Sequence, residues 1–110
     1  MASGTIHAER RDSSLITSFQ NSWHANGQNF LEVIGNYVHL HLSIRGGSTT
    51  SGETILYLPS VRPSSAVLAP IFNVNDKTLN GYILVTTSGT VTATGISNNQ
   101  YVISDVFWLM

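Results

Sequence analysis

The chain has 110 residues, a formal net charge of -1 at pH 7 and no cysteine, which excludes disulfides and thiolate metal sites. This length predicts one domain, large enough to bury a core by packing alone. Five Lys and Arg residues are too few for a surface that holds a phosphate backbone, so we expect no nucleic-acid partner.

Residues 1–13 contain a run of charged side chains from Glu9 to Asp12, which predicts an exposed lead-in or neck remnant of a longer protein. The sequence shows neither an apolar signal-peptide core nor the roughly 18 apolar residues of a membrane span. We therefore expect synthesis without a signal peptide and no membrane partner. Residues 14–110 are predicted to form the β domain. Residues 13–22 favour an extended segment. The alternative is one helical turn with Asp12 or Ser13 as its N-cap.

From Phe30 onward the pattern predicts strands. We expect them at residues 30–34, 37–44, 54–58, 66–74, 82–87, 90–94 and 101–109. Gly35-Asn36 and Ser88-Gly89 predict tight hairpins, whereas residues 46–52 and 73–81 predict loops. Pro70 lacks an amide donor and indicates a sheet edge or a bulge. Six to eight short strands with no helical periodicity predict an all-β fold, an antiparallel sandwich or barrel.

The closing strand is apolar on both faces. Val102, Val106 and Trp108 alternate with Phe107 and Leu109. A sandwich buries one face of each strand, so we expect sister copies to cover the other face. The alternative is a central strand that a loop of the same chain covers.

Charged residues make up 10% of the chain, well below the usual level of about 25%. A neutral, hydrogen-bonding surface suits contacts with identical subunits or with sugar hydroxyls. A β domain with many turns and Thr-rich strands would produce a similar composition, and this alternative stays open.

An ordered set of short motifs runs through most of the chain, from about residue 23 to the end. The set is Trp23 with Gly27, Val38 with Leu40, Ile55 with Leu58-Pro59, Arg62-Pro63, Gly89 with Val91, and Tyr101 through Trp108. It resembles the head domains of receptor-binding proteins on tail fibres and baseplates of phages that infect Gram-positive bacteria, above all lactococcal and streptococcal siphophages. Ser60-Val61 stands where that family commonly has Gly-Tyr, which puts the local loop shape in question.

The resemblance implies a jelly-roll-like head that assembles as a homotrimer and binds a host cell-wall polysaccharide. It also implies a place in the virion, at the distal end of the phage tail, with other baseplate or tail proteins contacted through the N-terminal side. Two alternatives remain: a structural baseplate or tail module with protein-only contacts, and a carbohydrate-binding domain of a wall hydrolase.

Saccharide binding requires an aromatic platform and a few planar polar groups. The predicted ligand-binding residues are Asp105, His39, His41, Arg62, Trp108 and Asn73, with Trp23, Tyr57, Tyr82, Asn75 and Asp76 as further candidates. Asp105 lies inside an apolar strand and must be paired or reach solvent, because an unpaired buried carboxylate is costly. The alternative to ligand contact is a core position for each of the two tryptophans, and for Arg62 it is a side chain that pins a loop.

His39 and His41 lie two residues apart on one strand face, as some metal-binding histidines do. No nearby motif supplies a third ligand, and Asp105 is only a candidate, so we expect neither a metal nor a cofactor. The commoner interpretation of the two imidazoles is structural, followed by ligand contact. The carboxylates are scattered and no nucleophile motif occurs, so we expect no catalytic residues and no enzyme activity.

Overall fold

The computed structural model describes residues 10–11 and 18–110. These residues form strands and connecting turns, and none of them is helical. The strands are β1 (Arg10–Arg11), β2 (His24–Ala25), β3 (Phe30–Ile34), β4 (Tyr37–Arg45), β5 (Glu53–Tyr57), β6 (Val67–Asn73), β7 (Thr78–Val85), β8 (Thr90–Thr94) and β9 (Val102–Leu109). No helix that could cross a membrane occurs in this part of the chain.

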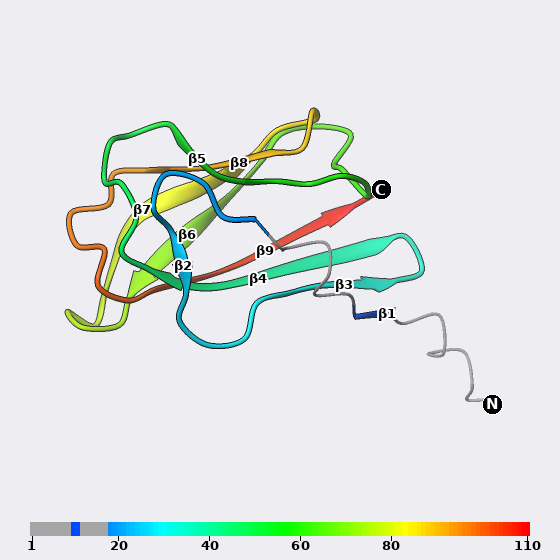
Figure 1. Cartoon of the computed structure of the whole chain (residues 1–110). Coiled ribbons are helices and arrows are strands. Elements are labelled where there is room, and N and C mark those ends of the chain that lie inside the picture. The colour runs from blue at the N-terminus through cyan, green and yellow to red at the C-terminus, as the bar shows by residue number, and fades with distance from the viewer. Residues whose placement is uncertain (1–9, 12–17) are drawn as a thin grey trace.

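The described strands belong to one antiparallel sheet that curls into a half-barrel (Figure 1). Its order is β1-β3-β4-β9-β6-β7-β8-β5, and β2 pairs with the end of β4. The prediction of an all-β antiparallel fold is confirmed. The backbone of β1, within the predicted lead-in, pairs with β3 at the edge of the sheet.

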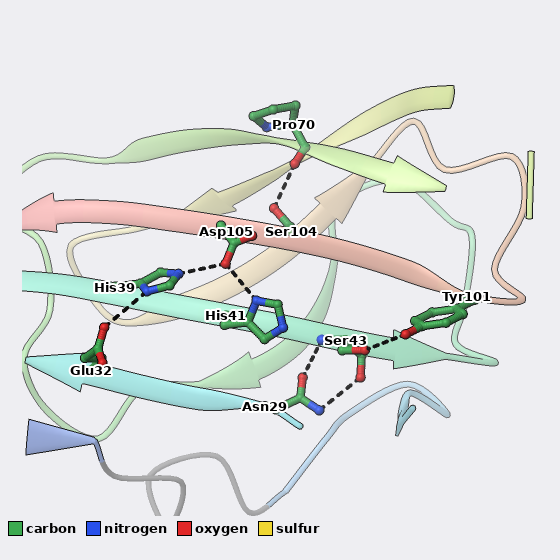
Figure 2. Close-up of polar contacts among 9 residues, drawn as sticks. All are labelled: Asn29, Glu32, His39, His41, Ser43, Pro70, Tyr101, Ser104 and Asp105. Carbon is green, nitrogen blue, oxygen red and sulfur yellow. Dashed lines mark hydrogen bonds and ion pairs between the residues drawn. The ribbon is translucent and has the colours of Figure 1, made fainter. Parts of the chain in front are cut away.

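The first predicted hairpin is confirmed. Ile34 pairs with Tyr37 across Gly35 and Asn36, and Gly35 has a φ of 60°, a conformation that glycine adopts at little cost. The preceding loop is held against β4 by Asn29, whose side chain accepts a hydrogen bond from the Ser43 amide and donates one to the Ser43 carbonyl (Figure 2). This pairing fixes the register of β3 on β4.

Pro70 lies at a bulge, one of its two predicted settings. The register of β6 on β7 shifts between Pro70 and Phe72, although β6 lies between β9 and β7 in the sheet. The Ser104 hydroxyl on β9 donates to the Pro70 carbonyl at 2.8 Å. A side chain thereby replaces a backbone partner at the point where the proline interrupts the ladder.

Two predicted loop boundaries were wrong. The loop expected at 73–81 is a turn of residues 74–77, because the Asn73 carbonyl accepts from Lys77 N and the Asn73 Oδ1 accepts from Asp76 N, and β7 begins at Thr78. The second hairpin is longer than two residues, since β7 ends at Val85 and β8 begins at Thr90. The two-residue strands β1 and β2 were not predicted.

The core fills the concave side of the curled sheet. It includes Val38, Leu40, Leu42 and Ile44 from β4, Ile55, Leu56 and Leu58 from the β5 region, Ile71, Ile83, Val85 and Val91 from the strands opposite, and Val102, Val106 and Trp108 from β9. The interior between β4 and β6 leaves no space for a water molecule.

The closing strand β9 turns one apolar face inward and the other outward. Trp108 is buried, whereas Phe107 is 48% exposed and Leu109 is 60% exposed. The alternative in which a loop of the same chain covers the second face is therefore wrong. Within the described residues, the end of this outer face at Phe107 and Leu109 stays exposed to solvent.

Candidate functional site

Strand pairing brings polar and aromatic side chains together on the convex face of the sheet. Glu32 on β3 is paired with His39 on β4, and His41 is paired with Asp105 on β9. Paired residues project to the same side of a sheet, so three strands deliver their side chains to one spot. We call His39, His41 and Asp105 the His-Asp cluster.

One carboxylate oxygen of Asp105 connects the two histidines of the cluster. Asp105 Oδ1 lies 2.7 Å from His39 Nε2 and 2.7 Å from His41 Nδ1. On the other side of His39, Nδ1 lies 3.5 Å from Glu32 Oε1. Figure 2 shows His39 between the two carboxylates, with His41 approaching Asp105 from the neighbouring position on β4. The side chains of His39 and His41 are 18% and 24% exposed, and that of Asp105 is 43% exposed.

Aromatic rings hold both imidazoles in place. His39 stacks on Phe107, with ring centroids 4.4 Å apart and an interplanar angle of 15°. His41 stacks on Phe30 at 5.1 Å and 23°. Tyr37 lies beside Phe107 at 5.8 Å and is itself 42% exposed. The cluster therefore has a restricted geometry and an aromatic border that reaches solvent.

The environment of Asp105 favours its ionised form. Burial alone would raise the pKa of the Asp105 carboxyl, but the hydrogen bonds from His39 and His41, together with their charges, outweigh it and lower the pKa below the ordinary value of 3.8. At neutral pH Asp105 therefore presents a carboxylate beside the two histidine side chains. Such a group can accept hydrogen bonds from hydroxyls or attract a cation.

The structure brings three of the six predicted ligand-binding residues together and places the others elsewhere. Trp108 is buried in the core and donates its indole N–H to the Val61 carbonyl at 2.9 Å. Asn73 is fully buried and donates to the Asn98 carbonyl at 2.8 Å. These two side chains serve packing and turn formation, so we remove them from the predicted ligand contacts.

Arg62 follows its alternative interpretation. Its Nε donates to the Leu58 carbonyl at 3.0 Å and so pins the loop after β5. Of the further candidates, Trp23 is buried, whereas Tyr57 on β5 and Tyr82 on β7 are exposed on strands that do not carry the cluster. Asn75 and Asp76 lie in the turn between β6 and β7.

Sequence reasoning missed the neighbours of the cluster, namely Phe30, Glu32 and Phe107. The signal for two of them was available, because a two-residue hairpin at 35–36 places Glu32 opposite His39 and Phe30 opposite His41. Phe107 was recognised as an outward apolar residue but not as a stacking partner of His39.

Comparisons of the chain with protein-family models, with curated proteins and with solved structures found no match.

Proposed function

We propose that this chain is the receptor-binding head domain of a phage that infects Gram-positive bacteria, and that it binds a cell-wall saccharide of the host. The observation that carries the proposal is the His-Asp cluster on the convex sheet face, bordered by the exposed rings of Phe107 and Tyr37. An aromatic border beside a few oriented polar groups is the arrangement that sugar rings require.

Each polar group of the cluster has a distinct use in this mode of binding. The Asp105 carboxylate accepts hydrogen bonds from sugar hydroxyls, and the imidazole nitrogens donate or accept according to tautomer. Phe107 and Tyr37 offer apolar surface to the C–H face of a sugar ring. The site is shallow, so recognition by one copy is weak and reversible. No chemical step is assigned to the cluster, and the proposed function is binding.

Weak sites become effective adhesins when several act together. We propose that the chain forms a homotrimer at the distal end of a phage tail, with sister copies covering the bare apolar part of β9 around Leu109, which is 60% exposed. Three linked sites raise the effective concentration of each for a repetitive polysaccharide. The N-terminal side would face other baseplate or tail proteins.

Binding of the labelled protein to lactococcal and streptococcal cells, and to polysaccharide extracted from their walls, tests this proposal. Asp105→Asn keeps the shape of the side chain but removes its charge. Hydrogen bonds to a charged group contribute about 1.5–3 kcal/mol, so we expect a loss of about tenfold or more in affinity per site. The matched control is Asp76→Asn, an exposed carboxylate in the turn between β6 and β7.

Asp76→Asn is expected to bind cells as the unmodified chain does. Equal adhesion of the Asp105→Asn protein, or no adhesion of the unmodified protein to any strain or polysaccharide, would contradict the proposal. Neither carboxylate lies in the core, so we expect both variants to fold. Circular dichroism checks the folding of each variant.

One observation favours a second function, that of a structural tail module. The convex face of β6 and β7 also exposes apolar side chains: Leu68 is 65%, Leu79 is 69% and Tyr82 is 38% exposed. A surface of this kind suits contact with another protein. Tight binding to baseplate proteins without binding to cells or wall polysaccharide would favour the structural module.

A further inference from the structure

We propose that His39, His41 and Asp105 form a binding site for a divalent transition-metal ion of the zinc type. The sequence supplied two histidines at a suitable spacing and left the third ligand open. The pairing of β4 with β9 supplies it, because His41 and Asp105 stand directly opposite each other. One ligand atom from each of the three side chains lies within 4.8 Å of the others.

The geometry requires the three ligand atoms to rearrange around the ion. Zinc bonds to histidine nitrogen and carboxylate oxygen are about 2.0–2.2 Å long, which places tetrahedral ligand atoms about 3.3 Å apart. The two N···O separations of 2.7 Å would have to widen by about 0.6 Å, and the two imidazole nitrogens, up to 4.8 Å apart, would have to reach the same spacing. Asp105 is 43% exposed and can swing toward solvent, and the two imidazoles would turn within their stacks on Phe107 and Phe30 to bring their nitrogens onto the ion.

Glu32 gives His39 the support that metal-binding histidines usually have. Its carboxylate lies 3.5 Å from His39 Nδ1, the nitrogen that faces away from Asp105. A proton held on Nδ1 by this carboxylate leaves the lone pair of Nε2 free for a metal.

The donor set indicates which ions fit. Two imidazole nitrogens and one carboxylate oxygen suit Zn²⁺, Co²⁺ or Ni²⁺, whereas Ca²⁺ and Mg²⁺ prefer sites made entirely of oxygen. Three protein ligands leave at least one coordination position open on the solvent side. A water or a hydroxyl oxygen would complete the shell.

Titration of the purified chain without a polyhistidine tag tests the site directly. Calorimetry with Zn²⁺ should show one ion per chain, and Co²⁺ should give the visible absorption of a low-coordinate nitrogen and oxygen site. His41→Gln and Asp105→Asn each remove one ligand. We expect Glu32→Gln to weaken binding by about 10–100-fold, as loss of a supporting carboxylate does elsewhere, and each ligand variant to weaken it by more.

The matched control is His24→Gln, an exposed histidine on β2 that should leave zinc affinity unchanged. Ca²⁺ is expected not to compete. Absence of zinc and cobalt binding to the unmodified chain at sub-millimolar metal would overturn the proposal, and so would an equal loss of affinity in His24→Gln and His41→Gln. The cobalt spectrum of the unmodified chain tests the metal site even if a variant fails to fold. Metal titration needs no saccharide, so its failure would not count against cell binding.

Discussion

Leu109 offers a direct test of whether sister copies cover the apolar end of the outer face of β9. It is 60% exposed, lies opposite Tyr37 on β4, and belongs neither to the core nor to the His-Asp cluster. Leu109→Ser removes apolar surface with little effect on the folded monomer, because exposed positions tolerate substitution. Any large effect must therefore come from association.

The expected magnitude follows from the exposed surface. Full burial of a leucine side chain contributes about 1.5–3 kcal/mol, so covering the exposed part of Leu109 would contribute about 1–2 kcal/mol per copy. At about 1.4 kcal/mol per copy, three substitutions change the trimer dissociation constant by about 1,000-fold. The trimer dissociation constant has units of concentration squared. The concentration at which half of the chains are assembled therefore rises by about 30-fold.

Sedimentation velocity from sub-micromolar to near-millimolar concentration measures this shift. We expect the unmodified chain to sediment as a trimer at micromolar concentration and Leu109→Ser to dissociate at much higher concentration than the unmodified chain. Tyr57→Ser is the control, since Tyr57 is also 60% exposed but lies on the edge strand β5, which does not pair with β9. A lone particle of 11.9 kDa at every concentration, or equal dissociation of the two variants, would refute the reasoning.

Two further predictions concern the tryptophans. A Cβ on Gly47 would overlap the ring of Trp23, so Gly47→Ala should destabilise the fold by about 1–3 kcal/mol or more, measured by urea unfolding. Gly52→Ala meets open space but places alanine at a φ of 83°, which costs about 1–2 kcal/mol, and Gly47→Ala should cost more than this; the reverse order would contradict the packing on Trp23. Trp108→Phe should cost more stability than Trp23→Phe, because it leaves the Val61 carbonyl without its donor, whereas Trp23 Nε1 is buried without a partner among the described residues. Equal losses in denaturant titrations would show that the Trp108 hydrogen bond contributes little.

Local signals predicted much of the sheet. The alternation from Val38 to Ile44 and the Gly35-Asn36 turn together specify the β3–β4 hairpin, because a two-residue loop allows one register. The prediction failed at the loop before β7, which Asn73 shortens. Its backbone carbonyl accepts a hydrogen bond from Lys77 N, and its side-chain Oδ1 accepts one from Asp76 N. Such bonds depend on how the side chain is oriented, which residue type alone leaves open.

The loop at 46–52 shows a second limit. Its glycines and serines predicted a flexible connection, but Gly47 is buried against Trp23 and Ser48 N donates to the Asn21 carbonyl. A glycine in a sequence indicates either a flexible backbone or a position where another side chain packs closely against the backbone. Only the tertiary contact with Trp23 distinguishes the two.

The His-Asp cluster could be predicted in part. His39, His41 and Glu32 follow from the hairpin register, but Asp105 is 64 residues from His41 along the chain. Its place opposite His41 depends on which strand pairs with the free edge of β4 and in which register. A shift of one residue would turn Asp105 to the other face, and a shift of two would bring Phe107 opposite His41.

A single carboxylate explains which way β9 faces. Both faces of this strand are apolar, but the inward set has one polar member near its middle, Ser104, which bonds to Pro70, whereas the outward set contains Asp105. Turning the strand over would bury the carboxylate, at a cost of several kcal/mol unless it were paired, and would move Trp108 into water. Asp105 therefore favours exposure of its own face, and Phe107 and Leu109 share that face. The polar cluster and the exposed apolar surface beside it have the same physical origin, so the proposed adhesive site and the proposed subunit contact on one strand require no separate explanation.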